Sequence, residues 1–125
     1  MLKILIVDDS PGILEKMKDI VSESGFIVFT ARDGTEGLGE LILGGVDIVI
    51  ADLNMPRMDG LTMIEFFHNI RKENIPTIML TTVITPELVE RGKKMGINAW
   101  FQKPLNRDAV LKTLEKIKEE TLRKK

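Results

Sequence analysis

Five short apolar runs rich in β-branched residues alternate with amphipathic segments, and this alternation limits the possible folds more than any other feature. The runs occupy residues 2–7, 26–31, 46–51, 76–80 and 99–102. Their length and composition predict strands. Strands that are apolar almost throughout are typically buried on both faces, which indicates a parallel sheet with helices on each side. The expected fold class is therefore α/β, with a doubly wound, five-stranded parallel sheet.

The segments between the runs carry helical patterns of different quality. Apolar residues share one helical face after the first run and near the end of the chain: Leu14, Met17, Ile20 and Val21, then Val110, Leu111, Leu114 and Ile117. The segment expected as a helix over 35–43 contains Gly37 and Gly39, each of which costs roughly 1 kcal/mol relative to Ala inside a helix. This helix is expected to be the least stable. Phe66, after the third run, is expected in the core.

The size and charge of the chain bound its organisation. With 125 residues, the chain has material for one domain, expected over 1–120, while 121–125 form a basic end or linker stub. A net charge of -1 gives no general attraction for nucleic acid, so direct binding to nucleic acid is not expected. No apolar stretch approaches the roughly 20 residues of a membrane helix. A cytoplasmic protein without membrane contact is therefore expected.

The residue inventory restricts the available chemistry. The sequence has no cysteine, which excludes disulfides, thiolate catalysis and cysteine-based zinc sites. Its single histidine, His68, cannot form a histidine cluster. Any chemistry must therefore use carboxylates, hydroxyls and amines.

Polar residues follow the predicted strands where ligands bind in open α/β sheets, beyond the carboxyl ends. They are Asp8 and Asp9 after the first strand, Asp52 after the third, Thr81 and Thr82 after the fourth, and Lys103 after the fifth. Taken singly, each has a structural explanation as a helix cap, a turn residue or a solvated charge. Together, at one edge of one sheet, they indicate a functional site.

The acids of this set predict a divalent cation site. If the first and third strands are neighbours, about 4.8 Å apart, Asp9 and Asp52 nearly meet. Two carboxylates about 4 Å apart repel each other by roughly 4 kcal/mol at an effective dielectric of 20, so a compensating cation is required. Carboxylate oxygens with room for water suit Mg2+. The long side chain of Lys103 can bring its ammonium toward an anion on Asp52.

Four motifs, in this order, resemble the receiver domains of bacterial two-component response regulators, most closely the single-domain chemotaxis type. They are residues 4–10 (ILIVDDS), 52–56 (DLNMP) with Asp59 and Gly60, 80–82 (LTT) and 103–104 (KP). The resemblance covers essentially all of residues 1 to about 120. It implies a flavodoxin-like (βα)5 fold with strand order 2-1-3-4-5.

The resemblance also implies a role for each site residue. Asp52 is the expected phosphoacceptor, and the expected Mg2+ ligands are Asp9, Asp52 and the backbone carbonyl of Asn54, with Asp8 acting mostly through water. Thr81 resembles the switch hydroxyl, Lys103 the phosphoryl-binding lysine and Trp100 the switch aromatic, and Pro104 is expected to be cis. Trp100 stands where Tyr or Phe is usual, and Thr82 where a small residue is frequent, so the larger indole is expected to rotate inward less fully.

The function implied by the resemblance is that of a signalling switch. The chain is expected to take a phosphoryl group from a histidine kinase or phosphotransfer protein onto Asp52, with Mg2+. A surface formed by the helix over 86–95, Trp100, Leu105 and the last helix would then bind a downstream target protein. The alternative is a phosphorelay intermediate or phosphate sink with no dedicated target. In either case the chain is expected to catalyse only its own phosphorylation and dephosphorylation, and not to be an enzyme with a separate substrate.

Two other protein classes share parts of this pattern. A flavodoxin-like cofactor-binding protein would need a loop rich in Gly, Ser and Thr after the first strand, whereas Asp8 and Asp9 repel a phosphate without a metal. A phosphohydrolase with an aspartate nucleophile would need a second acid two residues later, where this chain has Asn54. The sequence therefore favours a receiver over both.

Overall fold

A computed structural model describes residues 1–124, and over this range strands and helices alternate strictly. The elements are β1 (Lys3–Val7), α1 (Pro11–Ser22), β2 (Ile27–Ala31), α2 (Gly34–Leu43), β3 (Ile48–Asp52), α3 (Gly60–Arg71), β4 (Thr77–Thr81), α4 (Pro86–Lys94), β5 (Ala99–Gln102) and α5 (Arg107–Arg123). Lys125, part of the expected basic end, lies outside the described residues. Within them, no helix combines the length and hydropathy that a membrane span requires.

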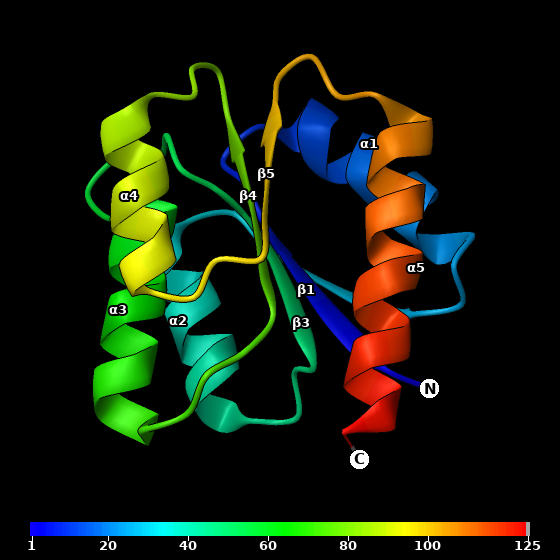
Figure 1. The fold of residues 1–125 in the computed structure, drawn as a ribbon, viewed down its shortest axis with the longest axis horizontal. Coiled ribbons are helices and arrows are strands. Elements are labelled where there is room, and N and C mark those ends of the chain that lie inside the picture. The colour runs from blue at the N-terminus through cyan, green and yellow to red at the C-terminus, as the bar shows by residue number, and fades with distance from the viewer. Residues whose placement is uncertain (125) are drawn as a thin grey trace.

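The strands form one parallel sheet in the order β2-β1-β3-β4-β5, which confirms the predicted doubly wound α/β fold. Helices α1 and α5 cover one face, and α2, α3 and α4 cover the other (Figure 1). Val7 of β1 lies opposite Ala51 of β3, and Asp52 lies opposite Leu80 of β4. The central strands therefore end at nearly the same level, so the residues that follow them share one edge of the sheet.

A polar side chain at each N-terminus explains where the helices begin. Each of these caps accepts a hydrogen bond from the backbone N–H three residues later, which satisfies a donor that the helix itself leaves unpaired. The caps of α1 to α5 are Ser10, Asp33, Asp59, Thr85 and Asn106. Because Ser10 caps α1, neither Asp8 nor Asp9 is needed for that role.

The core has two layers, one on each face of the sheet. Alternate residues of β1 divide between them: Ile4 and Ile6 pack toward α1 and α5, and Leu5 and Val7 pack toward α2 and α3. The predicted burial on both faces is confirmed for β3 and β4. It is wrong for β2 and β5, where most side chains are exposed or only half-buried, because these strands lie at the two edges of the sheet and the helices cover them incompletely.

The two glycines of α2 have different surroundings. A Cβ at Gly37 would lie 2.8 Å from Met63 Sδ and 2.9 Å from a methyl of Val7, so glycine allows α2 to approach β1 and α3 closely. A Cβ at Gly39 would have no neighbour within 4 Å. The helix cost of Gly37 is therefore offset by packing, whereas that of Gly39 is not.

The expected core position of Phe66 is wrong. Its side chain is 45% exposed, and its neighbour Phe67 is buried in the core instead. One residue along a helix corresponds to a rotation of about 100°, so adjacent phenylalanines cannot share a face. The face of α3 that packs on the sheet includes Phe67.

Candidate functional site

Asp8 and Asp9 follow directly after β1, in the turn that leads to α1. Asp8 is fully buried, and its Oδ1 accepts a hydrogen bond of 2.9 Å from the backbone N–H of Ser10. Asp9 is exposed. The turn therefore holds one carboxylate inside the protein and presents the next at the surface.

Asp52 ends β3, next to β1, and only 2% of it is exposed. Its Oδ1 accepts a hydrogen bond of 3.0 Å from the backbone N–H of Asn54, which fixes the carboxylate orientation. One oxygen from each of Asp8, Asp9 and Asp52 lies within 4.8 Å of the other two. The adjacency of β1 and β3 thus brings the acids together as their strand positions predicted.

Lys103 crosses from the end of β5 into this acid cluster. Its Nζ lies 3.2 Å from Asp8 Oδ2 and 3.3 Å from Asp52 Oδ2. The backbone N–H of Lys103 donates to the Thr81 carbonyl at 2.8 Å, and the following bond to Pro104 is cis, as the resemblance implied. The approach to Asp52 was predicted, but the contact with Asp8 was not.

The electrostatics of the cluster are unbalanced. Burial raises the pKa of Asp8 above its ordinary value of 3.8, and the neighbouring Asp52 charge adds to this effect, although the Ser10 N–H and Lys103 oppose it. Burial alone would lower the pKa of Lys103, but attraction to Asp8 and Asp52 outweighs it and raises that pKa above 10.5. Three acids therefore lie close together, and one ammonium contacts two of them, which leaves an excess negative charge.

The donor set fits a hard divalent cation. Carboxylate oxygens from Asp8, Asp9 and Asp52 are close enough to contribute to one site, and Mg2+ prefers oxygen ligands and few protein carboxylates. Because Asp9 is exposed, the group opens to solvent, where water can complete the coordination. The backbone carbonyl of Asn54 stays a predicted ligand.

Thr81 is buried at the end of β4, and its hydroxyl has two acceptors in reach. These are Asn54 Oδ1 at 3.1 Å and the Val83 carbonyl at 2.9 Å. The backbone N–H of Thr82 also donates to Asn54 Oδ1, at 3.4 Å. Sequence reasoning gave Asn54 a role only through its backbone and missed this contact, although the adjacency of the third and fourth strands was the available signal.

Trp100 lies in the middle of β5, opposite Met79 of β4, and is half-buried. Its indole packs toward α4, where a Cβ at Gly92 would come within 2.6 Å of Cζ2. The side chain of Thr82, which departs from the family pattern, is exposed. Leu105, expected on the target-binding surface, is instead buried in the core beside α1 and α5, because the chain turns inward before α5 begins.

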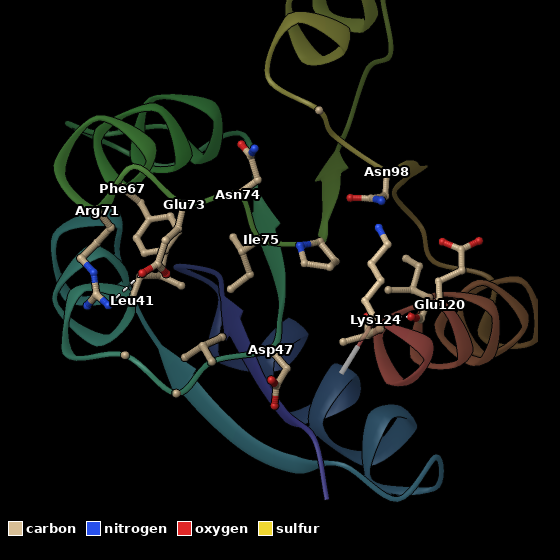
Figure 2. Close-up of a pocket in the computed structure, with 17 residues that line it drawn as sticks. Leu41, Asp47, Phe67, Arg71, Glu73, Asn74, Ile75, Asn98, Glu120 and Lys124 are labelled. Carbon is tan, nitrogen blue, oxygen red and sulfur yellow. Dashed lines mark hydrogen bonds and ion pairs between the residues drawn. The ribbon is translucent and has the colours of Figure 1, made fainter.

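A polar cavity lies at the opposite end of the sheet from the acid cluster, near the amino ends of β3 and β4. Its volume is about 520 Å³, and its lining includes Asp47, Arg71, Glu73, Asn98 and Lys124. Arg71 and Glu73 lie on one side, and Asn98 and Lys124 on the other (Figure 2). No residue of the predicted site lines this cavity.

Comparisons with known proteins agree with the fold. The family model "Response regulator receiver domain" matches residues 4–115. Sporulation initiation phosphotransferase F of Bacillus subtilis is 33% identical over 116 residues, which cover 90% of this chain and 93% of that protein. The transcriptional regulatory protein GlrR of Escherichia coli is also 33% identical, over 114 residues and 90% of this chain, but the match spans only 25% of GlrR.

A solved structure shows the same arrangement of elements. The CheX–CheY complex of Borrelia burgdorferi with beryllofluoride and Mg2+ contains a chain that matches with a TM-score of 0.85 and 31% identity, covering 93% of this chain and 88% of that one. The family model covers most of the described residues, and the shared topology places the acid cluster at the carboxyl ends of the strands. The chain therefore belongs to the response regulator receiver domains of two-component systems.

Proposed function

We propose that the chain is a phosphorylation-controlled switch in which Asp52 accepts a phosphoryl group from a histidine kinase or phosphotransfer protein. The observation that carries this proposal is the shared cluster of Asp8, Asp9, Asp52 and Lys103 at the carboxyl edge of the sheet. Such a cluster combines a nucleophilic carboxylate with groups that neutralise phosphoryl charge. Receiver domains act in two-component signalling, which fits the proposed donor.

The proposed transfer uses few groups of this chain. An Asp52 oxygen forms a bond to phosphorus while the bond between phosphorus and the donor's imidazole nitrogen breaks, and that nitrogen keeps the electron pair. Lys103, already 3.3 Å from Asp52 Oδ2, neutralises charge on the phosphoryl oxygens. The product is an acyl phosphate, and hydrolysis returns the Asp52 carboxylate and inorganic phosphate.

Mg2+ is the proposed cofactor. Asp9, Asp52 and the Asn54 carbonyl would hold it directly and Asp8 through water, and when bound it neutralises charge on the transferring oxygens. The Borrelia burgdorferi complex contains Mg2+ and a beryllofluoride group, which supports the same assignment here. The Asn54 N–H and Lys103 position the Asp52 carboxylate.

Thr81 is the proposed sensor of the phosphoryl group. In this structure its hydroxyl donates toward Asn54 and Val83, so recruitment to a phosphoryl oxygen requires exchange of these hydrogen bonds. A charge-assisted hydrogen bond contributes roughly 1.5 to 3 kcal/mol, enough to shift a two-state equilibrium about ten- to a hundredfold. Movement of Thr81 would free space toward Trp100 and change the surface of α4, β5 and α5, which we propose as the binding site of a target protein.

A phosphorelay intermediate is the second candidate function. The similarity to a sporulation phosphotransferase over nearly the full length of both chains favours it. In both functions the chain catalyses only its own phosphorylation and dephosphorylation. Affinity capture with beryllofluoride-loaded and unloaded protein separates the two, because a switch gains a target on loading and a relay intermediate binds only phosphotransfer partners.

Incubation with radiolabelled acetyl phosphate tests the proposed function. The wild type should acquire an alkali-labile label that requires Mg2+, and Asp52→Asn should stay at background because an amide is a poor nucleophile. Glu73→Gln, at the opposite end of the sheet, is the matched control and should label like the wild type. A label on Asp52→Asn that persists during the incubation and is removed by alkali would overturn the assignment.

A further inference from the structure

Gly92 is the one buried residue of α4, although glycine is unfavourable inside a helix. A Cβ at this position would lie 2.6 Å from Cζ2 of Trp100 and 3.2 Å from both Cε2 and Nε1. A distance of 2.6 Å is shorter than real Cβ atoms essentially ever show to a neighbouring heavy atom. The edge of the indole therefore occupies the space in which any other residue would place its side chain.

We infer that Gly92 forms a notch that holds the indole of Trp100 in the conformation in which Thr81 donates toward Asn54 and Val83, and thereby couples the switch aromatic to α4. The notch is defined as the gap in the α4 side-chain surface at Gly92. In the same structure, the Thr81 hydroxyl donates toward Asn54 and Val83 while the indole lies in the notch. Both switch residues thus have contacts that stabilise this conformation.

The coupling follows from the positions of the two residues. Trp100 lies opposite Met79 in the sheet, and Thr81 lies two residues further along β4 on the same face. An indole that moves toward the space left by Thr81 must leave the notch. The notch therefore stabilises the unphosphorylated form relative to the phosphorylated one. This coupling rests on the proposed function, whereas the notch itself does not.

Gly92→Ala tests the notch, with Gly39→Ala in α2 as the matched control. At Gly39 a Cβ meets nothing within 4 Å, so the helix preference alone acts and the melting temperature should rise by roughly 3 °C. At Gly92 the new methyl collides with the indole, so the melting temperature should fall by about 4 °C or more. Trp100 is the only tryptophan, so displacement of the indole should also shift the emission to longer wavelength and increase acrylamide quenching.

The double variant Gly92→Ala with Trp100→Phe keeps the test decisive if Gly92→Ala folds poorly. A phenyl ring is smaller than an indole, so the methyl should fit beside it. Gly92→Ala should therefore stabilise the Trp100→Phe variant while it destabilises the wild type. This reversal of sign supports the notch. An equal rise in melting temperature in both proteins, with unchanged emission in Gly92→Ala, would overturn it.

Beryllofluoride titration in the presence of Mg2+ tests the coupling. The wild type should respond with a change in Trp100 emission, and Gly92→Ala should bind beryllofluoride about fivefold or more tightly because its unphosphorylated form has lost the notch contact. Equal affinity of the two proteins for beryllofluoride would overturn the coupling, but the inference of the notch would stand. Absence of any binding to the wild type would overturn the proposed function and the coupling together, while the stability and emission tests of the notch would stand.

Discussion

The two ends of the sheet both carry charged residues, but they arrange them differently. At the amino end, a cavity of about 520 Å³ is lined by acids and bases together, and Arg71 pairs with Glu73 at 3.0 Å (Figure 2). At the carboxyl end, three acids lie within 4.8 Å of one another, and the ammonium of Lys103 contacts two of them. An excess of negative charge in a fixed geometry, rather than the size of a cavity, distinguishes the end that we propose to bind Mg2+ and to accept the phosphoryl group.

This difference has a physical cause in the fold. Parallel strands all present their carboxyl ends at the same edge, so residues that follow β1, β3, β4 and β5 converge there. Repulsion among Asp8, Asp9 and Asp52 is expected to lower the stability of the metal-free protein, and a bound cation would relieve it. The proposed function would therefore cost some stability at the carboxyl end of the sheet. The following variants test that contrast.

The largest effect is expected for magnesium binding by Asp9→Asn. Loss of an exposed carboxylate ligand should weaken Mg2+ binding by about a hundredfold, equivalent to about 2.7 kcal/mol, from an expected dissociation constant in the high-micromolar to millimolar range. Bound Mg2+ should raise the melting temperature of the wild type by linkage, so a titration followed by thermal unfolding measures the change. Glu120→Gln, in the lining of the opposite cavity, should retain the wild-type response. Equal losses in both variants would remove the distinction between the two ends.

A smaller effect is expected for the stability of Lys103→Ala in metal-free protein. Removal of the ammonium leaves the buried carboxylates of Asp8 and Asp52 without their cation, which should lower the free energy of unfolding by about 2 kcal/mol. Lys103 is partly exposed, which keeps this value below that of a fully buried pair. Arg71→Ala breaks an ion pair at the other end whose residues are more exposed, and should cost at most about 1 kcal/mol. Urea unfolding with a chelator compares the two, and a larger loss in Arg71→Ala would contradict the account.

The smallest effect, of opposite sign, is expected for Asp8→Asn in metal-free protein at neutral pH. Because burial raises the pKa of Asp8 in the folded state, its ionised carboxylate lowers the free energy of unfolding, and removal of the charge should raise it by a small amount. The penalty is absent below the unfolded pKa and is complete above the raised folded pKa, so the gain should disappear in acid. Asp47→Asn, which weakens a hydrogen bond from the Lys3 N–H at the opposite end, should not be stabilised. Destabilisation by Asp8→Asn at neutral pH would contradict the proposed repulsion.

Much of the fold was predictable because it depends on patterns along single segments. The apolar runs gave all five strands within two residues of their observed ends, and the resemblance gave the strand order. Two local errors have a common origin. The exposure of β2 depends on its place at the sheet edge, and the exposure of Phe66 depends on the rotation of α3 about its axis. The hydrophobicity of the local sequence predicts neither feature.

The site was predictable where it depends on strand order and not where it depends on side-chain conformation. The meeting of Asp9 with Asp52 follows from neighbouring strands, and the approach of Lys103 from its length. The hydrogen bond from Thr81 to Asn54 and the contact of Trp100 with Gly92 depend on rotamers and on the position of α4. Such contacts join residues that are separated in sequence and leave no periodic signal.

The most direct test of the central claim identifies the modified residue itself. The wild-type protein is incubated with acetyl phosphate and Mg2+, reduced with borohydride to convert an acyl phosphate into homoserine, digested and examined by peptide mass spectrometry. The account predicts homoserine at position 52 and at no other acid, with none formed when a chelator replaces Mg2+. Homoserine at Asp8 or Asp9 instead, with Asp52 intact, would contradict the assignment of Asp52 as the phosphoacceptor.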